Sequence, residues 1–453
     1  MKNRIEQDVL VKGERETEVN LYGPGALDQL DRILAAHWGD SPVLIVTDGT
    51  IWEAVGQRFE AFLRRRPNTT LHVLPASPAP YASDALVAKI AAVLSATKAI
   101  PVAVGAGTIN DIVKRAAFEN GMRYCSVPTA PSVDGFTSFG AAITVSGFKT
   151  TLECPPPLCV VADEGIVAGA PAELVASGYG DIIAKLTGGG DWIIAEEMGI
   201  ESIDRIAWDL AQTAAVGLLA KSRDIRGGDR ESIGILYKGL ISTGLAIQRY
   251  RDSRPASGTE HLLSHAWEMS QLQREGGEVS HGFKVAVGTL VSAALMRELF
   301  GEGGSLGVYV EGRGFAPRLD LLEYRLSLAE RLLGDSPLRE RILGTIRSKT
   351  PAEKDIAGRA ERARARWAEL SRRVLDQVPP FERLQRALRE AACPTEPRQI
   401  GLSREECASG LRIASLIRGR YTVLDLASEL GVLDQAVEAV FSSKYFGEYA
   451  PAR

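Results

Sequence analysis

The fold is decided by a strand, a glycine-rich turn and a helix start in the stretch Ile100-Pro101-Val102-Ala103-Val104-Gly105-Ala106-Gly107-Thr108-Ile109-Asn110-Asp111. The apolar run predicts a buried strand, and the pattern after it predicts a helix from about Asn110 to Glu119. Glycines between the two let backbone N–H groups approach an anion, and the helix N-terminus adds a favourable dipole. Because Asn110 stands where the G-x-G-x-x-G dinucleotide fingerprint has its third glycine, a tight turn without a ligand is an equal alternative on these residues alone.

The same order of strand and helix continues on both sides of this stretch. Short strands are expected at Val43–Asp48, Leu71–Leu74 and about Tyr124–Val127, and helices at Trp52–Leu63 and Ser83–Leu94. Alternating strands and helices predict an α/β domain with a doubly wound parallel sheet of the Rossmann-like kind. Right-handed crossovers then bring the loops at the strand carboxyl ends to one edge, where ligands bind.

Strand signals nearly vanish after about residue 165, and long helical periodicities follow. We therefore predict an α/β dinucleotide-binding domain over residues 1–168 and an all-helical domain over residues 169–453. Helix breaks are expected near Gly188–Gly190, Gly227-Gly228, Gly301–Gly304 and Pro379-Pro380.

The composition gives no sign of a nucleic-acid or membrane partner. The chain has 453 residues, with 53 Lys and Arg against 57 Asp and Glu, so its net charge of −4 gives no reason to expect nucleic acid or an anionic membrane. No apolar run reaches the roughly 18 residues of a membrane span, and the N-terminus lacks the apolar core of a secretory signal. The five cysteines are scattered without a CxxC pair. These features predict a reduced, cytoplasmic, soluble protein.

A polar loop follows the strand around Tyr124–Val127. Residues 126–138 carry several hydroxyl side chains, two prolines (Pro128 and Pro131) and Asp134, which together suggest a rigid, polar ligand-binding loop. A hairpin over residues 141–152 comes next, with Lys149 as a candidate anion contact.

Histidines predict a metal site. Of the five in the chain, His261, His265 and His281 fall within 21 residues, and the first two share one helix face at a spacing of four. A metal site also needs an anionic oxygen, and Asp181 follows two glycines at a helix head. The residues alone do not select it over three other carboxylates, namely Asp163, Glu260 and Glu268.

Taken together, the motifs resemble those of the iron-containing alcohol dehydrogenase and dehydroquinate synthase-like superfamily, and within it the glycerol-1-phosphate dehydrogenases. The resemblance runs from about residue 20 to residue 425 and is carried by five segments: residues 105–111, 129–135, 178–181, 253–261 and 281–282. The chain is longer than most relatives, and we place the excess helical length after residue 300.

The resemblance implies a function for individual residues. Asp48 would hold the adenosine ribose of NAD(H) or NADP(H). The pyrophosphate and nicotinamide would be bound by Gly105, Ala106, Gly107, Thr108, Ile109, Thr129, Ala130, Ser132 and Ser138. The metal ligands would be Asp181, His261 and His281. The spacing of four had favoured His265 as a ligand too, but the resemblance assigns it to the substrate.

The implied reaction is the NAD(P)-dependent interconversion of dihydroxyacetone phosphate and sn-glycerol 1-phosphate. Asp134 and His265 would be the catalytic residues and, with Asp181, would contact substrate, while Arg254 and Lys149 are candidates for its phosphate. One divalent ion is expected, Zn²⁺ by default, with Ni²⁺ or Fe²⁺ also suited to two imidazoles and a carboxylate. The family also implies a homodimer or larger homo-oligomer.

Two classes of alternative stay open. The same scaffold could act on another phosphorylated or phosphonate alcohol, or could be a dehydroquinate synthase-like cyclase. Outside enzymes, a non-catalytic cofactor-binding regulator is the alternative, since residues 422–443 are similar to a helix-turn-helix. Against a nucleic-acid partner, the Arg-rich stretch over residues 359–373 has interspersed acids, which is typical of a solvated helix face.

Overall fold

The computed structural model describes residues 16–145, 148–269, 272–274, 277–301, 316–441 and 445–446. These residues form two compact units. The first comprises the described residues up to Ile182 together with Asp209–Ser253, and the second comprises Ile183–Trp208 together with the described residues from Arg254 onward.

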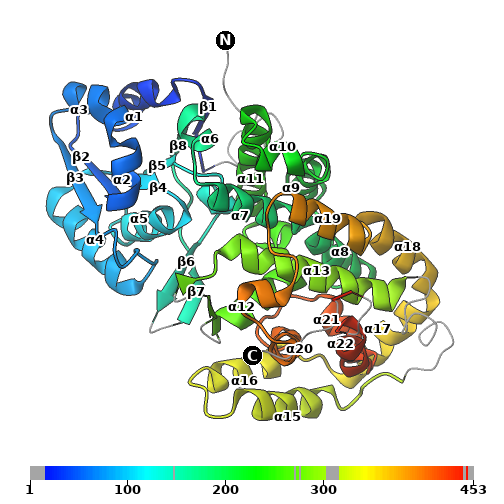
Figure 1. The fold of residues 1–453 in the computed structure, drawn as a ribbon. Coiled ribbons are helices and arrows are strands. Elements are labelled where there is room, and N and C mark those ends of the chain that lie inside the picture. The colour runs from blue at the N-terminus through cyan, green and yellow to red at the C-terminus, as the bar shows by residue number, and fades with distance from the viewer. Residues whose placement is uncertain are drawn as a thin grey trace. The chain divides into compact units, whose positions relative to one another are not determined.

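The first unit is built on a six-stranded parallel sheet, which confirms the predicted doubly wound α/β fold (Figure 1). The strands, in their order across the sheet, are β1 (Val19–Gly23), β8 (Cys159–Asp163), β5 (Cys125–Pro128), β4 (Ile100–Gly105), β2 (Val43–Asp48) and β3 (Thr69–Leu74). The sequence patterns did not reveal β1 and β8, which pair with each other in parallel. The predicted hairpin is present as β6 (Ala141–Val145) and β7 (Phe148–Leu152).

The inner strand β2 is buried on both faces of the sheet, and its alternate residues point to opposite sides. In β2, Val43 and Ile45 belong to a core that also holds residues of α1 (Leu30–Trp38) and α3 (Glu60–Arg65). Leu44 and Val46 belong to a second core with α4 (Asp84–Thr97) and α5 (Gly107–Glu119). The continuous apolar run of β2 therefore reflects burial on both faces.

The helix predicted over residues 52–63 is wrong as a single element. Asp48 caps an earlier start, and the chain forms α2 (Gly49–Val55), a 3₁₀ turn at Gly56–Phe59, and then α3. At the break, the Trp52 ring lies where a side chain at Gly56 would stand, 2.9 Å from a Cβ placed there. The other helices that begin in the first unit or run through its boundaries are α6 (Glu164–Ala168), α7 (Ala172–Ile183), α9 (Arg205–Leu218), α10 (Ser222–Arg226) and α11 (Arg230–Tyr250).

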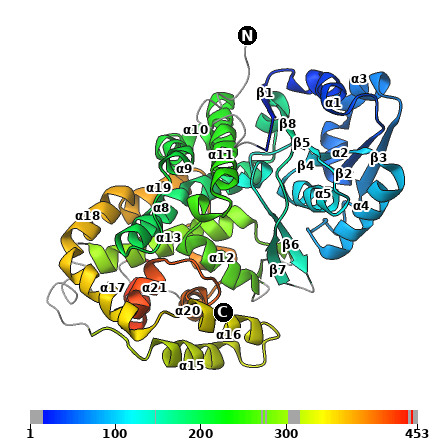
Figure 2. The ribbon, with the colours of Figure 1, turned by 180° about the vertical axis from the view of Figure 1, so that it is seen from behind.

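Among its described residues, the second unit is helical apart from the two-residue strands β9 (Gln273–Arg274) and β10 (Gly277–Glu278). Its helices are α8 (Lys185–Glu197), α12 (Thr259–Met269), α13 (His281–Phe300), α15 (Leu321–Leu333), α16 (Arg339–Lys349), α17 (Glu353–Ala365), α18 (Trp367–Gln377), α19 (Phe381–Glu390), α20 (Arg404–Ala414), α21 (Val423–Glu429) and α22 (Leu433–Val440). Nearly every residue of α8 and α13 is buried, and the later helices surround them (Figure 2).

The predicted break at Gly188–Gly190 is wrong, because α8 runs through all three glycines. These glycines allow close packing instead. A Cβ at Gly190 would lie 2.7 Å from Val378 and 2.9 Å from the sulfur of Met296. Glycine lowers the intrinsic stability of the helix, but its lack of a side chain lets neighbouring residues pack against α8.

The predicted division at residue 168 coincides with the end of α6, after which the described elements are helical except for β9 and β10. The compact unit that holds the sheet continues to Ile182 and also takes in α10 and α11. The functional division into a cofactor-binding and a metal-binding part stays a prediction. Within the described residues, none of the helices combines the length and apolar character needed to cross a lipid bilayer.

Candidate active site

The predicted dinucleotide site lies at the carboxyl edge of the sheet. β2 and β4 are parallel neighbours with Val46 opposite Ala103, so Asp48 and Gly105 end the two strands side by side. From β2 the chain moves outward to β3 and then returns to the other side of β2 as β4. That reversal is the topological switch point, where open α/β sheets form a ligand crevice.

The glycine-rich turn presents backbone donors at this edge. Ala106, the N-cap of α5, has an extended backbone and no side-chain oxygen that could accept from the first turn. The first N–H groups, those of Gly107, Thr108 and Ile109, therefore have no side-chain cap at the helix start. The glycines are also packing positions. A Cβ at Gly105 would lie 2.7 Å from Ile109, and one at Gly107 would lie 2.9 Å from Val133. The turn has the geometry to receive a phosphate.

Asp48 has a structural partner besides its predicted one. Its Oδ1 accepts a hydrogen bond of 2.9 Å from the backbone N–H of Ile51, which makes it the N-cap of α2. The side chain is 8% exposed. A carboxylate has further lone pairs beyond this bond, so capping and ribose recognition are compatible.

The loop after β5 contributes the other predicted cofactor residues. The backbone N–H of Thr129 donates to the carbonyl of Gly105 at 3.1 Å, which ties the loop to the glycine-rich turn. Thr129, Ala130, Ser132 and Ser138 are all buried. The Ser138 hydroxyl donates to the carbonyl of Gly135 at 3.0 Å and therefore braces the loop itself.

A buried lysine that sequence reasoning missed holds this loop in place. The ammonium of Lys114 on α5 donates to the carbonyls of Gly135 and Gly140 at 2.9 Å and of Ser138 at 3.0 Å. Its side chain is 0% exposed. Asn110, one helical turn earlier, also donates to Gly135, at 3.3 Å. The spacing of four on one helix face was the available signal, but its partners are backbone groups that no sequence pattern marks.

The predicted metal ligands come together. Asp181 on α7, His261 on α12 and His281 at the start of α13 each offer one ligand atom, and these atoms lie within 4.8 Å of one another. Asp181 is fully buried and accepts a hydrogen bond of 3.0 Å from the backbone N–H of Asp134. The imidazoles of His261 and His281 have centroids 5.4 Å apart. Two imidazoles and a carboxylate form a donor set that suits a divalent transition metal.

His265 lies outside this group of ligand atoms and has its own carboxylate. Its Nδ1 is 3.3 Å from Glu268, a residue that also forms an ion pair of 2.8 Å with Lys284. Burial lowers the pKa of the His265 imidazole to about 4 against the opposing effect of Glu268. The imidazole is therefore neutral at physiological pH. Lys284 was not anticipated from the sequence, although it stands one turn after His281.

The remaining predicted substrate residues differ in their surroundings. Arg254 is buried, forms an ion pair of 3.2 Å with Glu201, and donates to the backbone carbonyl of Asp191 at 2.9 Å. Asp134 lies on a 3₁₀ turn, Asp134–Phe136, within the loop braced by Lys114. The side chain of Lys149 lies outside the described residues.

The buried carboxylate of Asp191 holds the start of α12 by a hydrogen bond to its backbone. Asp191 on α8 accepts hydrogen bonds from the backbone N–H groups of Thr259 at 2.6 Å and Val423 at 2.7 Å. Burial and the nearby Glu260 raise the pKa of Asp191 to about 7. By these bonds Asp191 fixes the first residues of α12 and α21, and with them the position from which His261 projects.

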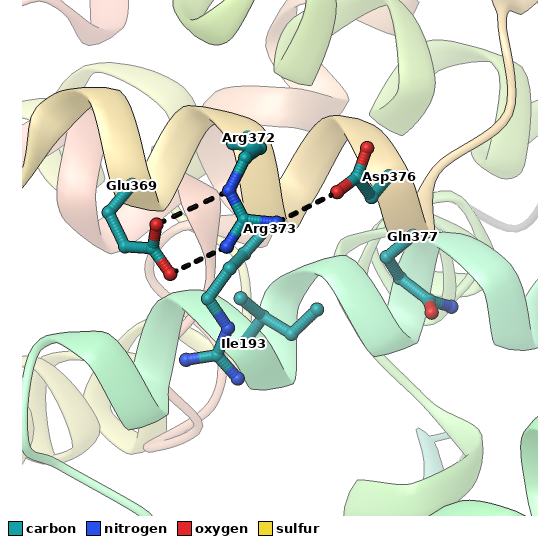
Figure 3. A pocket seen from close by; sticks show the side chains of 6 residues that line it. All are labelled: Ile193, Glu369, Arg372, Arg373, Asp376 and Gln377. Carbon is teal, nitrogen blue, oxygen red and sulfur yellow. Dashed lines mark hydrogen bonds and ion pairs between the residues drawn. The ribbon is translucent and has the colours of Figure 1, made fainter.

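A pocket between α8 and α18 contains none of the predicted site residues (Figure 3). Its arginines already have acidic partners, since Arg372 pairs with Glu369 and Asp376 while Arg373 pairs with Glu196 and Glu197. The pocket is lined by Ile193, Glu369, Arg372, Arg373, Asp376 and Gln377. Such neutralised arginines give little attraction for an anionic substrate.

Comparison with known proteins defines the class first. Residues 21–171 match the family described as iron-containing alcohol dehydrogenase. A probable glycerol dehydrogenase from Sinorhizobium meliloti shares the fold, with a TM-score of 0.58 and 17% identity over 92% of this chain and 96% of that one. The predicted fold class is thereby confirmed.

Sequence relatives are more specific. A glycerol-1-phosphate dehydrogenase [NAD(P)+] of Geobacillus stearothermophilus is 32% identical over 73% of this chain and 71% of its own length. Another, of Hyperthermus butylicus, is 30% identical over 60% of this chain and 76% of its own length. The chain belongs to the glycerol-1-phosphate dehydrogenase family, which confirms the predicted family and the prediction of an enzyme.

Proposed function

We propose that this chain catalyses the NAD(P)-dependent, metal-dependent interconversion of dihydroxyacetone phosphate and sn-glycerol 1-phosphate. The observation that carries the proposal is the convergence of ligand atoms from Asp181, His261 and His281 in a chain of this family. These residues would hold one divalent ion, and a bound ion would polarise the substrate oxygen as a Lewis acid. Zn²⁺ is the default choice, with Ni²⁺ and Fe²⁺ as alternatives.

The cofactor proposal rests on the edge of the sheet. The N–H groups that begin α5 would bind the pyrophosphate, and Asp48 would accept from the adenosine ribose. The pyrophosphate would be contacted by residues of the glycine-rich turn, namely Gly105, Ala106, Gly107, Thr108 and Ile109. The nicotinamide side would be lined by residues of the loop after β5, namely Thr129, Ala130, Ser132 and Ser138. A bound nicotinamide supplies or accepts the hydride.

His265 and Asp134 would form hydrogen bonds with the substrate hydroxyls. The Nδ1 of His265 faces Glu268, which leaves Nε2 to hydrogen-bond with substrate. Asp134 is held by the bond from its backbone N–H to Asp181, so its position is tied to that of a candidate metal ligand. A neutral His265 can accept a proton from an alcohol and return it in the reverse direction.

For the substrate phosphate, Arg254 and Lys149 remain our candidates. Arg254 would have to exchange or share its ion pair with Glu201. A charged pair that forms on phosphate binding is worth roughly 2–5 kcal/mol, so glycerol should react less efficiently than sn-glycerol 1-phosphate by roughly 30- to 5000-fold.

The test compares glycerol, sn-glycerol 1-phosphate and sn-glycerol 3-phosphate with NAD⁺ and NADP⁺ on the zinc-loaded protein. We expect absorbance of the reduced cofactor to appear with sn-glycerol 1-phosphate and far more slowly with the other two. Equal rates with glycerol, or preference for the 3-phosphate, would contradict the substrate. A cyclase would turn over its own substrate without a net change in NADH.

We also propose that the protein acts as a homodimer or larger homo-oligomer in the cytoplasm. β3 is an edge strand of the sheet, and its Leu71 and Val73 lie on one face, 37% and 42% exposed. All five cysteines are free thiols, as a reducing compartment would keep them. Light scattering coupled to size exclusion measures the oligomer, and a mass of 48.8 kDa would mean a monomer and contradict this proposal.

A further inference from the structure

A fully buried carboxylate stands beside one of the candidate metal ligands. Glu260, the second residue of α12, is 0% exposed. Its Oε1 accepts the backbone N–H of Gly258 at 2.6 Å and lies 2.9 Å from Nδ1 of His261. The hydroxyl of Thr187 on α8 donates to Oε2 at 3.2 Å. Both oxygens are therefore engaged.

The backbone around Glu260 is shaped to admit this carboxylate. A Cβ at Gly258 would lie 3.0 Å from Oε2, and one at Gly188 would lie 3.3 Å from Oε1. A Cβ at Gly288 on α13 would lie 2.6 Å from the carbonyl oxygen of Glu260. Three close approaches to one residue fix its position more firmly than a surface carboxylate could be fixed.

The charge of Glu260 needs a partner, since an isolated buried carboxylate is strongly destabilising. Within the described part of the chain, its one partner that can carry a positive charge is the imidazole of His261, which is a cation only when it is protonated. An imidazole that binds a cation through one ring nitrogen donates more strongly from the other. A metal on the far side of the His261 ring would therefore compensate the buried carboxylate.

We propose that Glu260 is a positioning residue for metal binding: it accepts the Nδ1–H of His261 and leaves Nε2 as the atom that faces the ion. The inference rests on the proposed metal site. It separates two acids that the sequence had offered equally as ligands, because Asp181 would bind the metal while Glu260 acts through the histidine.

The test replaces Glu260 by Gln, which keeps the shape but removes the charge. Zinc affinity is measured by competition with a chelator, and the cobalt-loaded protein gives an absorption spectrum that reports the ligand geometry. We expect Glu260→Gln to bind zinc about 10- to 100-fold more weakly and to alter the cobalt spectrum. The matched control is Glu298→Gln, a buried carboxylate on α13 whose partner is the hydroxyl of Tyr445 at 2.7 Å.

The outcomes separate this inference from the proposed function. If the wild-type protein binds no divalent metal, the proposed function fails. If wild type binds zinc and Glu260→Gln binds it within twofold as well, only the positioning role is overturned. Should the variant not fold, ¹⁵N-histidine NMR of the zinc-loaded wild type decides, because a His261 bound to zinc through Nδ1 would equally overturn the inference.

Discussion

Replacing Lys114 by Met tests how the loop that carries Asp134 is held. The ammonium makes hydrogen bonds to three backbone carbonyls, those of Gly135, Ser138 and Gly140, at 2.9–3.0 Å. A hydrogen bond with a charged donor contributes about 1.5–3 kcal/mol, and part of this sum is returned because Met has no charge to desolvate. We expect the free energy of unfolding to fall by roughly 3–5 kcal/mol, because three buried carbonyls lose a charged donor while the cost of burying the ammonium disappears.

Two measurements follow the loss. Urea denaturation monitored by circular dichroism gives the free energy of unfolding, and hydrogen–deuterium exchange should accelerate in peptides that cover residues 134–145. Because Asp134 moves with the loop, kcat/KM should fall by about 100-fold, as for a misplacement of about 1 Å. Lys89→Met, at an exposed lysine of α4, is the control. A Lys114→Met protein within about 0.5 kcal/mol of that control, with unchanged exchange, would refute the reasoning.

Three further predictions use the same assays. His265→Ala should keep its zinc and lose turnover, and loss of zinc would instead make His265 a ligand. Burial lowers the pKa of His265 to about 4, so between pH 4 and 6.5 the unfolded chain binds more protons than the folded chain. The contribution of His265 to folding stability is therefore complete above pH 6.5 and declines as the pH falls to 4. Thermal melts over this pH range should show that the melting temperature of His265→Ala depends less on pH than that of wild type. Asp48→Asn keeps an acceptor for the N–H of Ile51 but loses its charge, so the KM ratio of NADPH to NADH should fall, and an unchanged ratio would remove Asp48 from ribose recognition.

The sheet could be predicted because its information is local. Residues 43–48 and 100–105 are buried on both faces, and such strands appear as apolar runs that end in turn residues. β1 mixes Asn20 and Tyr22 with apolar residues and lacks such a run, so its pairing with β8 depends on a partner about 140 residues away, as Val19 opposite Cys159 shows. Pairing over that separation leaves no local pattern.

Part of the candidate site could be predicted from the sequence, and part depends on contacts that form only in the folded chain. Residue type and spacing marked His261, His265 and His281 as candidate metal ligands, and the resemblance then selected His261, His281 and Asp181, whose ligand atoms lie within 4.8 Å of one another. The partners of those residues were not found, since Lys284 and Glu268 meet only when α12 and α13 pack together. The Gly188–Gly190 run was misread for a related reason. Glycine signals a break when only the local chain is considered, whereas here it signals the approach of Gly258 and Met296.

The buried acids of the helical unit differ in how their negative charge is compensated. Asp191 is stabilised by two backbone N–H groups, and Glu268 by the ammonium of Lys284 at 2.8 Å. Glu260 has backbone and hydroxyl donors, but among the described residues its one partner that can become a cation is the imidazole of His261. Because charge that is unpaired in a buried site destabilises the folded state, the loss of a cation held by His261 should weaken the packing around α12 first. The ion would then contribute to the fold of this unit as well as to the chemistry proposed for it.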